Sequence, residues 1–276
     1  MTIAQKIIKY LATAFAIFLI VTIISIVLGI VNGFSYWLGM RKENEETNKD
    51  IKVTNFENTD INSLNIEISY ANLKIKPGEN LYLETNNEKI KSEIKNNTLY
   101  IEEKNKSWFN IDKNIEITLY IPTNTEYKDI KIKAGAGKVE IDQIYAEGFL
   151  FELGAGETFL NNINAVKYCK IESGAGKLSI HSSNINNLDL DMGIGEVYLN
   201  AKLIGKSDID SGVGTLIAEV YGDKEEYKIK IKKGVGSVIV DGENMEDNQI
   251  IGNGESFIEV DGGIGSINIS FINEII

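Results

Sequence analysis

Hydrophobic residues follow two patterns along this chain: one uninterrupted apolar run near the start, and a period-two alternation from residue 61 onward. The run Leu11–Val31 contains 21 residues and no charge. About 20 apolar residues in a helix are enough to cross the hydrocarbon core of a bilayer. We therefore expect residues 1–40 to form an N-terminal tail and a transmembrane anchor helix.

A cleaved signal peptide is the alternative interpretation of this segment, but the apolar run is too long and no small-x-small cleavage site ends it. Lysines at positions 6 and 9 flank one side of the run, while Arg41 and Lys42 flank the other. The charge bias is therefore weak, and the short tail before a long C-terminal domain favours an inside tail. We expect a single-pass protein of the cell membrane with an extracytoplasmic domain beyond a polar, acidic linker at 41–60.

The alternation is organised by a short repeat, Gly-x-Gly, which occurs seven times in the same apolar register, at successive spacings of 19, 20, 19, 19, 22 and 29 residues. A fixed period near 20 residues is typical of a solenoid, in which each repeat stacks on its neighbours. The predicted structural corners are the paired glycines Gly135 and Gly137, Gly154 and Gly156, Gly174 and Gly176, Gly193 and Gly195, Gly212 and Gly214, Gly234 and Gly236, and Gly263 and Gly265.

Every repeat has the same apolar register around the middle residue. In the first one, Ile130, Ile132, Ala134 and Ala136 alternate, and the alternation resumes one step out of phase at Val139. Period two indicates a strand with one buried face, so the middle residue is expected to face the core. A one-residue slip requires a bend or bulge, and glycine adopts the positive φ that such a corner needs.

The ends of the repeat array are less regular. Ile66, Ile68 and Tyr70 match the register, with Ala71-Asn72-Leu73 in place of Gly-x-Gly, and the runs between residues 81 and 122 suggest irregular opening layers. Gly252-Asn253-Gly254 resembles a decayed corner, and the apolar segment 270–276 suggests an end cap. The sequence thus predicts a single-domain, all-β, β-helix-like solenoid at 61–276, with coils of about 20 residues, preceded by one transmembrane helix.

Composition and net charge exclude several classes of partner and of functional site. The 276 residues carry a net charge of −12, and because residues 1–40 contain only two lysines and no acid, residues 41–276 carry −14. So acidic a domain is a poor partner for nucleic acid, which requires a basic face. Cys169 and His181 are single representatives of their types, which excludes a disulfide framework, a Cys-pair zinc site and a His-based triad.

Two glycine motifs invite a cofactor interpretation that their neighbours do not support. Gly-Ala-Gly-Lys precedes Val139 and Leu178 where a phosphate-binding loop needs Ser or Thr, and no GxGxxG opens a helix. The segment from Gly262 has Ile267 where a calcium-binding nonapeptide repeat needs Asp. We therefore expect no nucleotide, no metal and no other cofactor.

Acidic side chains are the remaining candidates for a site. Pairs spaced by two residues share the strand face opposite the core, and general acid–base chemistry by such pairs is possible in principle. The pairs are Glu140/Asp142, Asp189/Asp191 and Asp208/Asp210, with Glu225/Glu226 adjacent in sequence. Their regular outward positions favour solvated side chains, and no nucleophile–base set accompanies them. The sequence therefore predicts that the protein is not an enzyme.

The pattern also gives expectations for Cys169, for His181 and for the pair Trp108-Phe109. Cys169 falls in the buried register, which is typical of an inert structural thiol. His181 follows a core position and is expected to point outward. The pair Trp108-Phe109, inside a polar loop, either folds under into the core or marks a contact surface.

The segments ANLKIKPGENL, IKAGAGKVEI, IESGAGKLSI and DSGVGTLIAEV, behind a short basic N-terminus and one anchor helix, resemble the membrane-anchored DUF4097 family. This group of Gram-positive bacteria is also described as adhesin-like or β-strand repeat proteins, and the resemblance covers about residues 61–276. It implies an accessory protein of the cell envelope. The family has no assigned catalytic residues, so none are carried over.

These observations leave three functional classes. The first is a non-catalytic interaction module at the outer membrane surface, acting in adhesion, envelope stress sensing or regulation. The alternatives are a polysaccharide-active β-helix enzyme at the envelope and an inward-facing membrane-anchored scaffold. The negative charge favours a protein or envelope partner that is cationic or neutral, or one bound through a metal-bridged acidic face.

Overall fold

The computed structural model describes residues 51–56, 60–104, 115–123 and 125–272. The chain divides into two units, Met1–Asn48 and Lys49–Ile276, and all described residues belong to the second. The expected anchor Leu11–Val31, the pair Trp108-Phe109 and residues 273–276 lie outside the described part. Within it, no helix combines the length and hydropathy that a membrane span needs.

The described residues of the second unit are all-β, apart from one short 3-10 helix, η1 (Lys224–Glu226). Its strands fall into three groups along the chain. The first is β1 (Lys52–Asn55), β2 (Ser63–Gly78), β3 (Tyr82–Thr85), β4 (Ile90–Lys95), β5 (Thr98–Glu103) and β6 (Glu116–Pro122). The second is β7 (Glu126–Ile141), β8 (Ile144–Asn161), β9 (Ile163–Asn186), β10 (Leu188–Ile204) and β11 (Lys206–Tyr221). The third is β12 (Tyr227–Lys232), β13 (Val235–Val240), β14 (Glu243–Asn244), β15 (Ile250–Ile251), β16 (Ser256–Asp261) and β17 (Ile264–Ile272).

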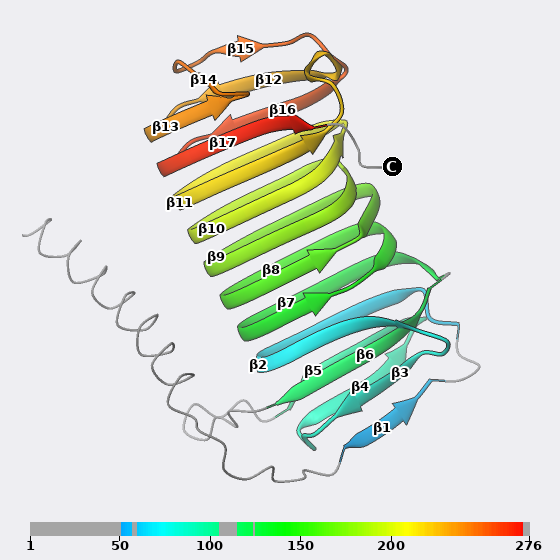
Figure 1. Cartoon of the computed structure of the whole chain (residues 1–276). Helices are drawn as coiled ribbons and strands as arrows, with labels where there is room; N and C mark the ends of the chain where they lie inside the picture. Colours follow the sequence, from blue (N-terminus) through cyan, green and yellow to red (C-terminus); the bar gives the residue numbers. More distant parts are fainter. Residues whose placement is uncertain (1–50, 57–59, 105–114, 124, 273–276) are drawn as a thin grey trace, which may run out of the picture. The chain divides into compact units, whose positions relative to one another are not determined.

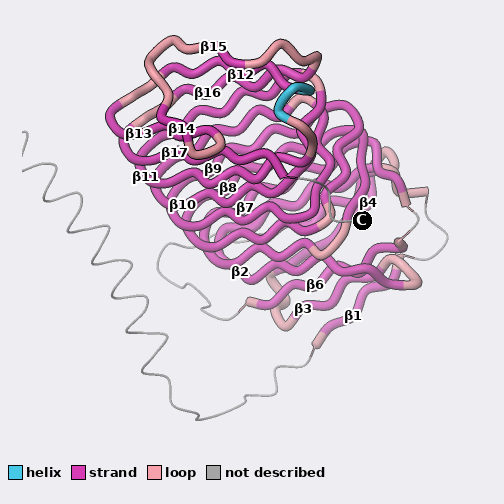
Figure 2. The backbone as a smooth tube through the Cα atoms, turned by 45° about the horizontal axis from the view of Figure 1, so that its top comes forward, coloured by secondary structure: helices cyan, strands magenta, loops and turns pink. Residues whose placement is uncertain are grey.

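The middle group forms the solenoid proper. Strands β7 to β11 are each one coil, and each pairs in parallel with the next in chain order (Figure 1). Each strand bends at its Gly-x-Gly, so that the chain winds around a core lying between the two halves of every coil (Figure 2). In β8, for example, Phe149 and Phe151 are buried before the bend and Leu160 is buried after it. The predicted all-β, solenoid-like fold is therefore present.

The middle residue of Gly-x-Gly does not face the core, contrary to the predicted register. Between the buried residues Ala134 and Val139, the chain runs around the outside of the bend, and the four residues between them do not enter the core. Valine and isoleucine at this position are well exposed: Ile194 is 41%, Val213 44%, Ile264 56% and Val235 72% exposed.

The C-terminal coils are not stacked in chain order. Strands β16 and β17, which carry the last Gly-x-Gly, lie between β11 on one side and β12 and β13 on the other. Figure 1 shows β17 between β11 and β13. The sixth repeat of the sequence is thus the outermost coil, and the seventh fills the gap behind it.

Two sequence expectations for this end are wrong as a result. Residues 270–272 do not form an end cap, because they belong to β17 and pair with β11. The cap consists instead of β14 and β15, which pair antiparallel with β13 and β12, and of the buried Met245. Gly252-Asn253-Gly254 is no corner, since a Cβ on Gly254 would overlap the backbone of Glu226 and Tyr227, away from the glycine columns.

The N-terminal end has a similar construction. Strand β2 pairs in parallel with β7 on one side and with β5 and β6 on the other, while β1, β3 and β4 add antiparallel strands. These are the irregular opening layers that the sequence predicts. The degenerate corner, however, is Ser69-Tyr70-Ala71 and not 71–73, because Tyr70 pairs with Ala136 and Ala71 with Gly137.

Candidate functional site: the acidic face beside the corner

The glycines of the corners lie in two in-register columns. The second glycine of every repeat has a positive φ, for example 142° at Gly195. The first glycine has an ordinary φ, but a Cβ there would overlap backbone of the adjacent coil, as Gly174 would against Gly154. The phase slip in the sequence indicated the positive φ of the second glycine. Nothing in the sequence indicated the close approach of backbone at the first glycine, because this contact arises only when coils stack.

The side chains that point outward just before the corner form two further columns. Their members lie opposite one another in the parallel pairing, about 4.8 Å apart from coil to coil. The near column, two residues before the first glycine, is Glu67, Lys133, Glu152, Glu172, Asp191, Asp210, Asp261 and Lys232. The far column, four residues before it, is Asn65, Lys131, Leu150, Lys170, Asp189, Asp208, Glu259 and Lys230. We call these two columns together the acidic face.

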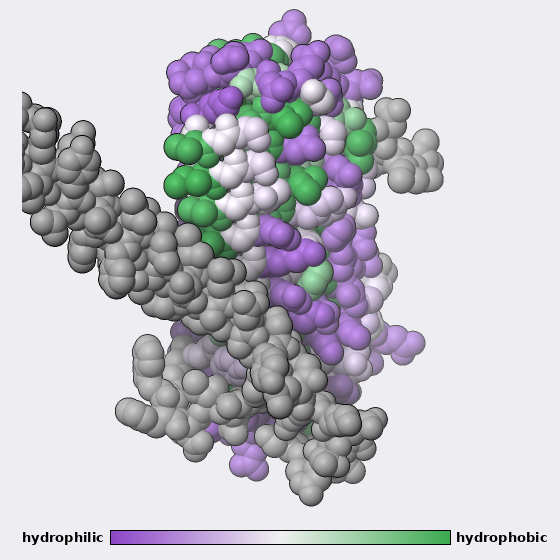
Figure 3. Space-filling view, turned by 60° about the vertical axis from the view of Figure 1, so that its left-hand side comes forward, coloured by the Kyte–Doolittle hydropathy of each residue, from purple (hydrophilic) through white to green (hydrophobic). Residues whose placement is uncertain are grey.

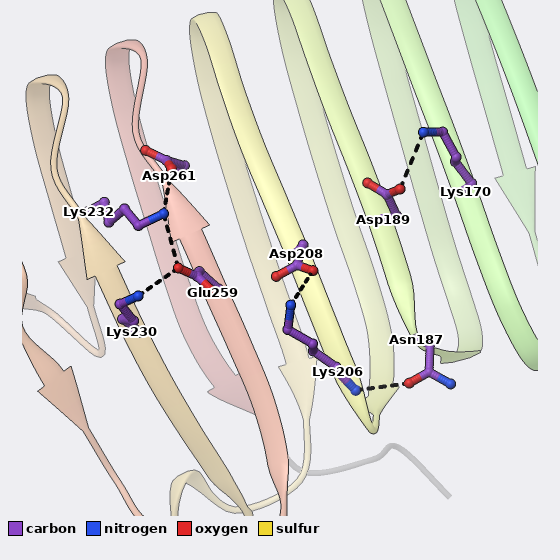
Figure 4. Close-up of polar contacts among 9 residues, drawn as sticks. All are labelled: Lys170, Asn187, Asp189, Lys206, Asp208, Lys230, Lys232, Glu259 and Asp261. Carbon is purple, nitrogen blue, oxygen red and sulfur yellow. Dashed lines mark hydrogen bonds and ion pairs between the residues drawn. The ribbon is translucent and has the colours of Figure 1, made fainter.

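Lysines neutralise part of this face. At its C-terminal end, the Nζ of Lys230 lies 2.8 Å from Glu259, and the Nζ of Lys232 lies 3.1 Å from Glu259 and 2.9 Å from Asp261 (Figure 4). Hydrogen bonds from these two ammonium groups lower the pKa of Glu259 to about 2. Glu259 is therefore ionised over the whole physiological range.

At the other end, Lys133 and Lys131 hold Glu152, with Nζ–carboxylate distances of 2.5 and 3.3 Å. Their hydrogen bonds lower the pKa of Glu152. The Nζ of Lys170 lies 3.2 Å from Glu172. It also lies 3.4 Å from Asp189, and the Nζ of Lys206 lies 2.7 Å from Asp208 (Figure 4). Most carboxylates of the acidic face thus have a cationic neighbour.

Two adjacent near-column carboxylates differ from the rest. Asp191 and Asp210 lie opposite one another on β10 and β11, and within the described residues neither forms an ion pair. Partial burial, followed by the charges of Asp191, Asp261 and Asp208, raises the pKa of Asp210. Ionisation of Asp210 is therefore opposed by burial and by its acidic neighbours, with no ion pair to offset this effect in the part of the chain that the structure describes.

A shallow furrow of about 610 Å³ runs across the coils between the near column and the corner. Its walls come from the same three positions of successive coils: the near-column residue, the residue that follows it, and the first glycine. The furrow crosses β2, β7, β8, β9 and β10 and ends at Asp191, Met192 and Gly193. It is open along its length, and its lining repeats from coil to coil instead of converging on one point.

The carboxylate pairs predicted from the sequence lie on different parts of the surface. Asp189, Asp191, Asp208 and Asp210 belong to the acidic face, as their spacing by two suggested. Glu140 and Asp142 lie after the corner and therefore on a different part of the surface, and Glu225 and Glu226 belong to η1. The sequence did not indicate that carboxylates of successive coils align, so Glu152, Glu172 and Asp261, which complete the near column, were not predicted.

Cys169 and His181 occupy the expected kinds of position. Cys169 is 1% exposed, and burial raises the pKa of its thiol, so the reactive thiolate is disfavoured. The ring of His181 packs against Tyr198 with centroids 4.9 Å apart. No group of three or more potential metal ligands occurs among the residues that the structure describes.

A model of the Toastrack DUF4097 family matches residues 61–253 of this chain. The chain belongs to this family. The match covers the Toastrack repeats from β2 to the turn after β15, and therefore includes most of the acidic face. No curated protein matches the chain.

Solved structures similar to this Toastrack protein include three adhesin candidates. A candidate cell-adhesion protein from Clostridium sporogenes ATCC 15579 is 18% identical, with 81% of this chain and 99% of that chain covered and a TM-score of 0.35. A candidate adhesin from Bacteroides fragilis NCTC 9343 is 15% identical, with coverages of 80% and 97% and a TM-score of 0.32. One from Parabacteroides distasonis ATCC 8503 is 10% identical, with coverages of 82% and 98% and a TM-score of 0.31.

Proposed function

We propose that this Toastrack protein is a non-catalytic interaction module, anchored in the cell membrane through Leu11–Val31 and displayed outside the cytoplasm. Its acidic face binds a cationic partner. The observation that carries the proposal is the in-register run of carboxylates Glu152, Glu172, Asp191, Asp210 and Asp261 across five adjacent coils.

The physics of such a column favours multivalent binding. Carboxylates repeat about every 4.8 Å along the stack axis, so a ligand that lies across the strands meets several charges at once. Individual exposed charge pairs contribute little, about 0.2–1 kcal/mol each, but several held on one scaffold add up. A repeated lining is typical of recognition of an extended partner, whereas catalysis requires a few groups that converge on one bond.

The binding part is tested with the full-length chain in phosphatidylcholine nanodiscs and a fluorescent oligolysine of about ten residues as the probe. Binding should weaken steeply as salt shortens the Debye length from about 10 Å at 0.1 M to about 3 Å at 1 M. The double variant Asp191→Asn/Asp210→Asn should bind the probe more weakly than the matched control Glu79→Gln/Glu93→Gln, whose exposed carboxylates lie outside the acidic face. Equal binding by the two variants would contradict the proposal.

The display part is tested by topology. A reporter that is active only outside the cytoplasm, fused after Ile276, should be active, and deletion of residues 11–31 should release the protein from the membrane fraction. Activity of a cytoplasm-specific reporter at the same position would show an inward-facing scaffold instead.

A further inference from the structure

The corner residues between the two glycine columns form an exposed line of side chains along the stack, which we call the corner ridge. Its members are in register with one another. In stack order they are Ala136, Ala155, Ala175, Ile194, Val213, Ile264 and Val235. The ridge therefore changes character halfway, from alanine to branched apolar residues.

The corner itself does not require these larger side chains. The same bend, with the same glycines on both sides, is built three times around alanine. Because the flanking glycines have no side chains, Ile194, Val213, Ile264 and Val235 are 41–72% exposed. Contiguous apolar residues on a surface typically mark an interaction site, and Figure 3 shows apolar side chains gathered along one edge of the stack beside a pale band.

The surroundings of this apolar half define the chemistry of what covers it. On one side lie the near-column residues of the same coils, Asp191, Asp210 and Asp261. On the other side, Thr215 and Ser266 share a hydroxyl contact of 3.3 Å. The surface is thus an apolar line with a carboxylate row on one flank and hydroxyls on the other.

We propose that the apolar half of the corner ridge, together with Asp191 and Asp210, docks a cationic amphipathic helix of a partner protein. This inference rests on the proposed function and names the partner chemistry. The helix lies along the stack axis, with its apolar stripe on Ile194, Val213 and Ile264 and its Lys or Arg side chains towards the carboxylates.

The spacing of the coils along the stack is close to the pitch of an α-helix. Four coils span about 14 Å at about 4.8 Å per step, which is close to three turns of an α-helix at 5.4 Å per turn. An apolar residue at every third or fourth position of such a helix meets one coil each. A second copy of this chain fits poorly, because it brings carboxylates against carboxylates, and an anionic lipid surface is repelled for the same reason.

The test uses the full-length chain in phosphatidylcholine nanodiscs. The probe is a fluorescent leucine–lysine peptide of about 14 residues with leucines at i, i+3 and i+4, and empty nanodiscs give the background. The ridge variant is Val213→Ala/Ile264→Ala, which copies the alanine corners of the same chain. Its matched control is Ile51→Ala/Val53→Ala, which removes similarly exposed apolar side chains (64% and 52%) from β1 and the residue preceding it.

We expect the ridge variant to weaken peptide binding about tenfold and its control to change binding by less than about twofold. Asp191→Asn/Asp210→Asn should also weaken binding and flatten its salt dependence. A peptide of the same composition with scrambled order should bind less well than the amphipathic one.

Three results would overturn the inference. One is wild-type affinity in the ridge variant, and another is equal binding of the scrambled peptide, which would show that charge alone is recognised. The third is a ridge-dependent dimer by mass photometry of the same nanodiscs, which would make a second copy the occupant. If one of these results is obtained and the wild-type protein still binds oligolysine, only the inference about the helix fails and the proposed function stands. If the wild-type protein does not bind oligolysine either, the inference and the proposed function both fail.

Discussion

Neighbouring corner residues have opposite tolerances for a change of side chain. Gly195 has a φ of 142° and its missing Cβ leaves room for the carbonyl oxygen of Gly176, whereas Ile194 next to it projects into solvent. A methyl group on Gly195 meets both a strained backbone conformation and an occupied space. The same methyl group at position 194 meets neither.

We therefore expect Gly195→Ala to lower the free energy of unfolding by about 2–4 kcal/mol. Ile194→Ala should lower it by less than about 1 kcal/mol, since the side chain of Ile194 lies outside the core and is 41% exposed. Chemical denaturation of the two variants measures both values. Similar losses in both would mean that the corner glycines are not required for stacking.

Replacement of Glu259 or Asp210 by the corresponding amide residue should change the stability of the fold in opposite directions. The pKa of Glu259 is lowered to about 2, so its ionised form stabilises the fold above the ordinary value near 4.3, and this stability is lost as the pH falls through 2. The pKa of Asp210 is raised, so its ionised form carries a penalty at neutral pH that disappears as the pH falls through the raised pKa.

At pH 7, Glu259→Gln should therefore lower the melting temperature, at a cost of about 1 kcal/mol, and Asp210→Asn should raise it. Both differences should shrink in acid, where the wild-type carboxyls become neutral: Asp210 first, and Glu259 only between about pH 4 and pH 2. Thermal unfolding followed by circular dichroism across this pH range checks the signs. A destabilised Asp210→Asn variant at pH 7 would contradict the penalty that burial and the neighbouring carboxylates place on ionised Asp210.

At the scale of the elements, the order of the last coils decides how the end of the stack unravels. In a solenoid stacked in chain order, removal of the last repeat shortens the array by one coil. Here, β16 and β17 lie inside the stack, and β12 and β13 make their parallel pairs with these strands.

Truncation after Glu255 should consequently unfold more than it deletes. We expect residues 222–255 to lose hydrogen-exchange protection together, while β7 to β10 keep it, because those coils pair in chain order. Retained protection in β12 and β13 would mean that they pair with β11 once the gap is vacant.

The elements also show where the sequence was informative. The alternation identified the coils, and the phase slip located the bend at each second glycine, because both depend on neighbours along the chain. The outward direction of Ile194 and Val213 was misjudged, since apolar residues at a period of two imitate a buried face. The placement of β16 and β17 depends on pairing between coils of near-identical pattern, which no local signal specifies.

At the scale of the whole molecule, charge should decide how the domain behaves at a membrane. Residues 41–276 carry −14, and anionic head groups repel such a domain within a Debye length. Without residues 1–40, the protein should therefore remain unbound when floated with anionic liposomes at low salt, while the full-length chain should float with them.

Strong flotation of the shortened protein without divalent cations would contradict this expectation. Flotation that appears only with added calcium would instead indicate a metal-bridged acidic face. The variant Asp191→Asn/Asp210→Asn, which removes two adjacent carboxylates of the near column, distinguishes a bridge at these residues from one elsewhere on the acidic surface.

The position of β16 and β17 also has a consequence for biosynthesis. A chain emerging from the ribosome or the translocon can stack β7 to β11 as it appears, but it cannot close the C-terminal part until β17 has emerged. The outermost coil, formed by β12 and β13, is synthesised before β16 and β17, the strands that will lie between it and β11. Prematurely terminated chains therefore leave the edge of β11 that pairs with β16 and β17 without its partner, and unpaired strand edges make incomplete chains prone to aggregation.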